Sequence, residues 1–200
     1  MLKLTLAATI AVAAAAHGAI TINEIRTGAG NAQYVEFKGD PGESFDGLTF
    51  LIIGDGTLGG GSPTKSGVVE WIWRFTPGTV IGSNGYLVLR NPGQNPANAS
   101  DTTGPFPFTV DPACTDLPWT YTASGLAADT QFERAKNQTF LLVTGFSGTD
   151  AYTTRAPGGS SGQDLDTNDD GILDVTPWTA IVDSVALKET NGPVPGSGQD

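Results

Sequence analysis

The sequence predicts an all-β domain, a sandwich or a barrel, with long loops rich in Gly, Asn and Pro. The chain of 200 residues contains 27 glycines and 13 prolines, and no segment carries a long helical pattern. Its apolar residues instead fall in short runs separated by turn residues, which is typical of β-sandwiches and barrels. These runs predict strands at residues 20–25, 34–38, 48–53, 68–75, 86–90, 106–110, 139–144 and 179–187.

Residues 1–19 have the pattern of a secretory signal peptide. Lys3 supplies a positive start, an apolar run follows at residues 4–16, and small residues continue to Ala19. The run is too short for a membrane-spanning helix, so we expect cleavage between Ala16 and Ala19 and a mature chain without a membrane span. The protein is therefore expected to be secreted or at the cell surface, with one domain at residues 20–189. Residues 190–200 are expected to form a flexible tail or linker.

Composition excludes several classes of function for the mature chain. Its 9 Lys/Arg against 21 Asp/Glu give a net charge of −12, which disfavours direct binding to nucleic acid. The only histidine, His17, lies in or beside the signal peptide, so histidine-dependent triads, Cys-His pairs and the usual zinc sites are not expected. Cys114 is the only cysteine and has no internal disulfide partner. Composition does not exclude catalysis by carboxylate groups or the binding of metals through oxygen ligands.

Three short motifs open the domain: INEI at residues 22–25, YVEF at 34–37 and DGLTFLIIGDG at 46–56. Together with the acidic segment at 164–187, they resemble lamin-tail-like modules of exported bacterial proteins, over most of residues 20–189. The third motif departs from the family, because it lacks the more usual tryptophan. The resemblance implies an immunoglobulin-like β-sandwich with a noncatalytic role in adhesion or domain attachment, and it brings no catalytic residues. Such modules occur alone or beside nucleases, phosphoesterases and other surface-protein domains.

Trp71 and Trp73 are two residues apart on one predicted strand and therefore face the same way. Two exposed indole rings in one plane would form a platform for stacking sugars, which makes a carbohydrate-binding module the alternative function. Burial in the sandwich interior is the favoured interpretation, because large aromatic residues dominate such cores.

Glu24, Glu36 and Glu70 lie on predicted strands and raise the third possibility, a hydrolase that uses only carboxylates. Glycosidases hold two carboxyl groups either about 5–5.5 Å or about 6.5–9.5 Å apart. Solvent-facing alternation along the strands explains all three glutamates without catalysis, and we favour that interpretation.

An acidic loop precedes the last predicted strand. Its oxygen-bearing side chains alternate, with a glycine at the sixth place, as in the first half of an EF-hand loop. Pro177 occupies the twelfth place, so the bidentate glutamate is missing. The loop predicts a weak calcium site, the alternative being a solvated turn. The expected ligands are Asp166, Asn168, Asp170, the carbonyl of Ile172, and Asp174, and Asp150 and Asp183 are possible additions.

The strand after this loop alternates in hydrophobicity, and we expect Ile181, Val185 and Leu187 to face inward. Taken together, these patterns predict a noncatalytic exported attachment module stabilised by calcium. Its partner is expected to be an extracellular protein or a polysaccharide. An accessory domain of an extracellular hydrolase or nuclease is a further alternative.

Overall fold

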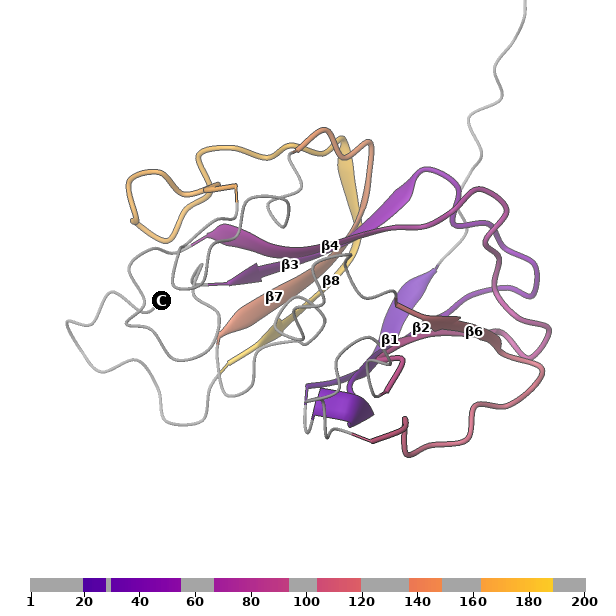
Figure 1. Cartoon of the computed structure of the whole chain (residues 1–200). Coiled ribbons are helices and arrows are strands. Elements are labelled where there is room, and N and C mark those ends of the chain that lie inside the picture. Colours follow the sequence, from indigo (N-terminus) through magenta and orange to yellow (C-terminus); the bar gives the residue numbers. More distant parts are fainter. Residues whose placement is uncertain are drawn as a thin grey trace, which may run out of the picture.

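A computed structural model describes residues 20–27, 30–54, 67–93, 104–119, 137–148 and 163–188 (Figure 1). The predicted signal peptide at 1–19 and the predicted tail at 190–200 lie outside these residues, as does Asp150. The described elements are β1 (Thr21–Arg26), a 3-10 turn η1 (Gly30–Ala32), β2 (Tyr34–Lys38), β3 (Leu48–Gly54), β4 (Val68–Arg74), β5 (Tyr86–Arg90), β6 (Thr115–Pro118), β7 (Gln138–Thr144) and β8 (Ala180–Leu187). Within the described part of the chain, no helix has the length and apolarity needed to cross a bilayer.

The strands form two four-stranded sheets packed face to face, which confirms the predicted β-sandwich (Figure 1). We call them sheet A, with the order β1-β2-β5-β6, and sheet C, with the order β4-β3-β7-β8. If β1 to β5 are equated with immunoglobulin strands A, B, C, C′ and E, and β7 and β8 with F and G, both sheet orders follow the immunoglobulin pattern. The exception is β6, which follows β5 in sequence and pairs with it in parallel.

The main core lies between the sheets and is built by strand alternation. On β2, Val35 and Phe37 are fully buried, whereas Glu36 between them faces outward, because successive side chains point to opposite faces. Phe37 contacts three other phenylalanine rings edge to face, at centroid distances of 5.5 Å from Phe45 and Phe50 and 5.7 Å from Phe75. Aromatic pairs in this geometry are worth about 0.5–1.5 kcal/mol beyond the area they bury. The sandwich is therefore held by an aromatic centre rather than by a disulfide.

A second, smaller core lies on the outer face of sheet C. Leu51 and Ile53 of β3 and Leu141 and Val143 of β7 point away from the main core, yet they are buried. They are covered by residues from the segments at 146–148 and 163–178, namely Phe146, Leu165, Leu173 and Trp178. The acidic segment is thus part of the lid over this face, which explains why β3 and β7 read as continuous apolar runs rather than as alternating ones.

One strand was predicted in the wrong place. Residues 106–110 do not form a strand; the short strand next to β5 is instead β6, at Thr115–Pro118. Pro105 and Pro107 flank Phe106 and lack the backbone N–H that a ladder needs, so the segment crosses the outer face of sheet A as irregular chain. The β6 sequence TDLP carries its own proline and an aspartate, which is why its pattern gave no strand signal.

The predicted inward set of β8 is partly wrong. Val185 and Leu187 pack against the main core as expected, but Ile181 is 50% exposed and Val182 packs inward in its place. The pairing with β7 shifts between Leu142 and Val143, so β8 contains one extra residue there. Beyond a bulge of this kind, the inward and outward positions of the strand are exchanged. A simple two-residue alternation in hydrophobicity does not predict this exchange.

Asp183 joins the two sheets where their edge strands meet. β1 is at one edge of sheet A and β8 at one edge of sheet C, and the two strands are in contact. The backbone N–H of Ile22 on β1 donates to Oδ2 of Asp183 on β8 at 2.7 Å. This side chain therefore links the two sheets.

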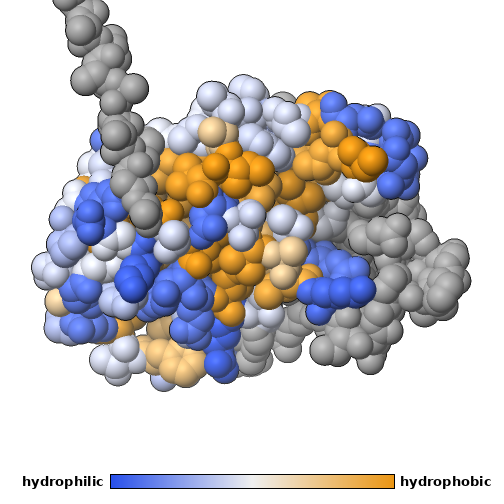
Figure 2. Space-filling model, turned by 180° about the vertical axis from the view of Figure 1, so that it is seen from behind, coloured by the Kyte–Doolittle hydropathy of each residue, from blue (hydrophilic) through white to orange (hydrophobic). Residues whose placement is uncertain are grey.

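Several large apolar side chains remain at the surface. Figure 2 shows hydrophobic residues gathered across the middle of the face seen from behind. Among the described residues, the exposed large hydrophobic side chains are Val80, Phe108, Ile172, Val175 and Ile181. Single exposed apolar residues are ordinary and need no functional explanation by themselves.

Candidate functional site

The acidic loop is folded around Asp166, which is 1% exposed. Its Oδ1 accepts the N–H of Asp170 at 3.2 Å and its Oδ2 accepts the N–H of Gly171 at 2.8 Å. Gly171 has a φ of 85°, and Asp169 is the one described non-glycine residue with a positive φ, at 58°. These backbone angles produce the sharp turn that the glycine at the sixth place predicts.

The other predicted ligands also accept hydrogen bonds within the loop. Asp174 Oδ2 accepts from the N–H and hydroxyl of Thr167, at 2.9 and 2.6 Å. Asn168 Oδ1 accepts the N–H of Asp170 at 3.0 Å, and Asp170 Oδ1 accepts the N–H of Ile172 at 2.9 Å. The side chain of Ile172 points into solvent and is 71% exposed.

The five predicted ligands therefore lie in one short loop, but the side-chain oxygens of Asp166, Asn168, Asp170 and Asp174 accept hydrogen bonds from within that loop in this conformation. Within the residues described, no group of three or more His, Cys, Asp or Glu side chains converges on a point where a metal would sit. A carboxylate oxygen has a second lone pair, so these hydrogen bonds do not exhaust the oxygens. The calcium site stays a prediction.

The two tryptophans of β4 belong to the main core. Trp71 is 6% exposed, Trp73 is half-buried, and their rings stack at 5.9 Å with an angle of 10° between planes. Trp119, which is also buried, contacts Trp71 edge to face at 5.6 Å. The two rings face the same way and point inward, as the favoured interpretation predicts, so they offer no exposed platform for a sugar ring.

The glutamates are divided between surface and core. Glu24 and Glu36 face each other across the β1–β2 pair on the outer face of sheet A, where the first is exposed and the second half-buried. Each carboxylate has a donor: the Tyr34 hydroxyl donates to Glu24 Oε1 at 2.7 Å, and the Asn23 amide to Glu36 Oε1 at 2.6 Å. Like charges placed opposite each other repel, so these donors offset part of that repulsion.

Glu70 does not face solvent, contrary to the prediction. It is 4% exposed, and its Oε2 accepts a hydrogen bond from the Gln138 amide at 3.2 Å. The β3–β4 pairing shifts between Ile52 and Ile53, which places Glu70 at a bulge. Its carboxyl fills the space over Gly54, where an added Cβ would meet the carboxyl atoms at 2.5 Å. Glu70 is thus separated from the Glu24–Glu36 pair by the sandwich.

A surface that the sequence did not single out lies on the outer face of sheet A. Tyr34 pairs with Arg26 on β1 and with Arg90 on β5, so these three residues form one row across the sheet. The irregular segment after residue 104 places Phe106 and Phe108 against Tyr34, edge to face, at 6.3 and 6.0 Å. We call these five residues the aromatic–arginine surface.

The two arginines of this surface lie over the two phenylalanine rings. The Arg26 guanidinium is 5.0 Å from the centroid of Phe108, and that of Arg90 is 4.8 Å from the centroid of Phe106. Such cation–π contacts are worth about 0.5–1 kcal/mol at exposed sites. Phe108 is nevertheless 44% exposed. The arrangement thus keeps an aromatic ring and cationic groups together at the surface.

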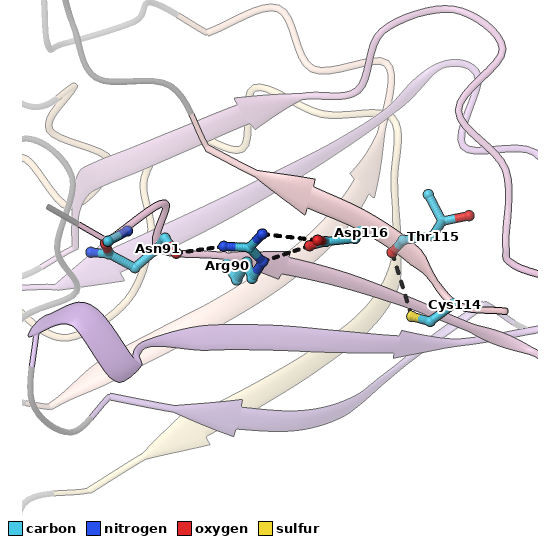
Figure 3. A network of polar contacts seen from close by, with 6 residues as sticks. Arg90, Asn91, Cys114, Thr115 and Asp116 are labelled. Carbon is cyan, nitrogen blue, oxygen red and sulfur yellow. Dashed lines mark hydrogen bonds and ion pairs between the residues drawn. The ribbon is translucent and has the colours of Figure 1, made fainter. Parts of the chain in front are cut away.

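Arg90 is fixed from the neighbouring strand (Figure 3). Its Nε and Nη2 donate to the two carboxylate oxygens of Asp116 on β6 at 2.6 and 2.8 Å, and Nη1 donates to the Asn91 carbonyl at 3.3 Å. A two-point arginine–carboxylate contact fixes orientation as well as distance. At the start of β6, the Cys114 thiol donates to the Thr115 carbonyl at 3.4 Å. The parallel strand β6 therefore supports the surface from one side.

Two side chains in or near this surface have shifted acidity. The pKa of Tyr34 is raised from 10.0 to about 12, first because burial disfavours the charged phenolate and then because the phenol donates to Glu24. Burial likewise raises the pKa of the Cys114 thiol, from 9.0 to about 11. The Cys114 thiolate is therefore disfavoured at neutral pH, which argues against a nucleophilic role.

The sequence contains one signal for this surface. The run Pro105-Phe106-Pro107-Phe108 places two aromatic residues among prolines, and such a run cannot continue a ladder. Its phenylalanines must then pack on some other surface. Which surface they pack on depends on the sheet order, which a local pattern does not contain.

Comparison of the chain with protein-family models, with curated proteins and with solved structures finds no match.

Proposed function

We propose that this domain is a noncatalytic attachment module of an exported protein, similar to lamin-tail-like modules, and that it binds through the aromatic–arginine surface. The observation that carries the proposal is the difference between the two outer faces of the sandwich. Sheet C is covered by its own chain over the second core, with Leu165 fully buried beneath it. Sheet A instead presents a row of Arg, Tyr and Arg with two phenylalanines on it.

The chemistry of this surface suits contact with a macromolecule. Tyr, Phe and Arg are enriched in protein interfaces, where rings supply apolar area and guanidinium groups supply several donors. Arg90 is already held by Asp116, so little side-chain freedom is lost when a partner binds. The flanking carboxylates of Glu24 and Glu36 add acceptors on the same sheet. Aromatic rings, hydrogen-bond donors and hydrogen-bond acceptors in one place suit contact with either an extracellular protein or a polysaccharide.

Two observations support a noncatalytic role. The chain has no histidine after His17. The carboxylates of Glu24 and Glu36 lie on the outer face of sheet A, and each accepts a hydrogen bond from a neighbouring side chain. A carbohydrate-binding module built on Trp71 and Trp73 is not favoured, because Trp71 is in the core.

Calcium is proposed as a stabilising ion of the acidic loop. The alternating oxygens and the positive φ of Gly171 support it, and calcium is the usual choice for flexible oxygen ligands outside the cell. Because the loop lacks a bidentate glutamate, we expect a dissociation constant on the order of 10⁻⁴–10⁻³ M. The ion would stabilise the lid over sheet C rather than take part in binding.

The attachment proposal is tested with the purified domain and a cell-envelope preparation from the organism that encodes it. Phe108→Ser and Arg26→Ala each remove one side chain of the aromatic–arginine surface. We expect either change to weaken binding by about tenfold, since anchoring residues contribute more than about 1 kcal/mol and 1.4 kcal/mol is tenfold. Ile172→Ser is the matched control, because it removes a still more exposed apolar side chain from the acidic loop.

The control variant should bind like the wild type, and all variants should melt at nearly the same temperature. Treating the envelope with protease beforehand separates a protein partner, whose binding is then lost, from a polysaccharide partner, whose binding persists. Equal loss in Phe108→Ser and Ile172→Ser would contradict the assignment of the surface. Robust hydrolytic turnover by the purified domain would contradict the noncatalytic role.

A further inference from the structure

The sequence contains two Asp–Pro bonds, Asp40–Pro41 and Asp111–Pro112, and both lie in described parts of the chain. Each bond opens a tight turn. In each turn the N–H of the fourth residue donates to the carbonyl of the aspartate at 2.9 Å. Proline suits the second place of such a turn because its ring fixes φ. The backbone thus treats the two bonds alike, so a difference between them must come from the side chains.

A glutamate carboxyl group is held beside the first bond. Oε2 of Glu43 accepts the N–H of Asp40 at 3.0 Å, and Oε1 is buried. Only the Cα and the carbonyl carbon separate the Asp40 nitrogen from the nitrogen of Pro41. Gly42, with a φ of 81°, allows the chain to turn so that Glu43 returns to Asp40. The bond therefore has one carboxyl group on the residue that supplies its carbonyl and a second one within the same turn.

The chain packed against this turn carries no charge. Around Gly39, the Glu43 carboxyl group lies next to the buried side chains of Ile20 and Ile81. The backbone of Ile81 also bonds to the turn, since its N–H donates to the Glu43 carbonyl at 2.9 Å. Residues 79–85, which include this segment, contain no ionisable side chain. The two acids of the turn therefore have no basic group beside them on these segments.

The second bond has the same backbone turn with different side chains. Oδ1 of Asp111 accepts the N–H of Ala113 at 2.8 Å, so this oxygen is already engaged. The fourth residue is Cys114, whose thiol donates to the carbonyl of Thr115 at 3.4 Å. The protein thus contains an internal comparison, in which two bonds of one kind lie in similar turns and only the first has a second carboxyl group next to it.

We propose that Asp40–Pro41 is a self-cleavage site. The Asp40 carboxylate attacks its own carbonyl carbon, and the new bond from Oδ to that carbon closes a five-membered anhydride ring. The bond from the carbonyl carbon to the Pro41 nitrogen breaks, and a protonated Glu43 carboxyl group gives its proton to this nitrogen, which leaves as a secondary amine. Water then opens the anhydride, so that Asp40 ends with two carboxyl groups, and a proton released in this step restores Glu43.

Three features of the turn favour this reaction. The attacking group and the carbonyl belong to one residue, so no second molecule has to be positioned. The N–H of Glu43 donates to the Asp40 carbonyl oxygen, on which negative charge develops during the attack. The leaving nitrogen is that of proline, which is more basic than an ordinary peptide nitrogen and so accepts a proton more readily. A positioned acid typically contributes about 10²–10⁴-fold to the rate of such a step.

The cut would leave both sheets intact. It lies between β2 and β3, which belong to sheet A and sheet C respectively, so it breaks no ladder of hydrogen bonds. The two fragments would therefore stay together through the pairing of β2 with β5 and through the main core. The inference goes beyond the proposed attachment role and is independent of it, because the reaction changes the protein's own chain once and acts on no other molecule.

The test compares the two bonds within one protein. The purified domain is kept at about pH 5, where glutamate carboxyl groups are protonated in part, and mass spectrometry follows the fragments from each bond. We expect Asp40–Pro41 to break at least about 100-fold faster than Asp111–Pro112. In urea, which unfolds both turns, the two rates should become similar. Glu43→Gln keeps an acceptor for the Asp40 N–H and should slow the first bond about 100-fold while leaving the second unchanged.

Glu24→Gln is the matched control, because it removes a glutamate elsewhere on sheet A, and it should cleave like the wild type at both bonds. Asp40→Ala removes the attacking group and should abolish cleavage at the first bond. Thermal melts at the same pH confirm that each variant is folded. A ratio of the two rates that is equal in the folded protein and in urea would overturn the proposal, as would wild-type cleavage in Glu43→Gln. A folded wild-type chain that stays whole at Asp40–Pro41 would overturn it as well.

Discussion

Asp166 illustrates how far one side chain can determine a loop. It combines almost complete burial with two backbone donors, so its carboxylate closes the acidic turn from inside. The substitution that tests calcium binding should therefore spare Asp166, whose loss would unfold the turn with or without an ion. Asp170 is exposed and is the better choice, since its own N–H contacts would remain.

We expect calcium to raise the melting temperature of the wild-type domain. Stabilisation by mass action amounts to about 1–1.5 kcal/mol at ten times the dissociation constant, which corresponds to a few degrees. Asp170→Ala should lose most of this increase, whereas in chelator it should lose only the hydrogen bond from Ile172. Asp40→Ala, which removes an exposed carboxylate elsewhere, should respond to calcium like the wild type. Wild-type melts that coincide in calcium and in EDTA would leave the loop as a turn without an ion.

A second prediction at this scale concerns Tyr34. Glu24→Gln should lower the pKa of Tyr34 from about 12 toward 10, but not fully, because burial is the larger cause of the shift. A raised phenol pKa favours the neutral form in the folded state, so its contribution to stability is present below pH 10 and is lost as the pH rises through about 12. Ultraviolet titration against Tyr34→Phe isolates this tyrosine, and an unchanged pKa in Glu24→Gln would contradict the role of the hydrogen bond.

Side-chain environments were predictable only where the local pattern is regular. Glu36 points outward between the buried Val35 and Phe37, as strand alternation predicts. Glu24 is exposed as predicted, although the pairing of β1 shifts between Ile22 and Glu24. Glu70 does not, because a bulge and the missing side chain of Gly54 open a buried place for it. The residues that bury Glu70 come from other strands, so the two-residue alternation along β4 does not reveal them.

At the scale of elements, the strands themselves were largely predictable, and their deviations share one cause. β2 and β5 were predicted at their observed limits, since each is a short run of apolar residues closed by turn residues. Ile181, by contrast, was assigned to the wrong face because a bulge lies within β8. The strand β6 was missed because it has a weak strand sequence and is held by pairing with β5. Pairing partners are long-range information, and a local pattern does not carry it.

The contact between β1 and β8 gives a prediction about stability. Asp183→Ala should lower the free energy of unfolding by about 1–3 kcal/mol, because it leaves the part-buried N–H of Ile22 without its acceptor. Asp183→Asn keeps an acceptor oxygen and should lose less. Ser184→Ala, on the exposed neighbour, should have little effect. Denaturant unfolding measures all three, and a wild-type midpoint for Asp183→Ala would contradict the role assigned to this bond.

At the scale of the whole molecule, an all-β domain, either a sandwich or a barrel, followed from composition and turn spacing, and the lamin-tail resemblance implied the immunoglobulin-like sandwich. The aromatic–arginine surface did not follow from the sequence. It combines β1, β2, β5 and the segment after residue 104, so it exists only once sheet A is assembled. The calcium-binding prediction drew on one contiguous loop, whereas the aromatic–arginine surface required four segments and could not be read from any one of them.

The placement of the first and last strands has a mechanical consequence. β1 and β8 belong to different sheets and meet along one edge of the sandwich. Tension applied through both strands would pull sheet A away from sheet C, instead of unzipping one ladder a hydrogen bond at a time. The load would then be shared by the aromatic interior and by the bond between Ile22 and Asp183. A sandwich loaded in this way would resist as a unit and give way in one step.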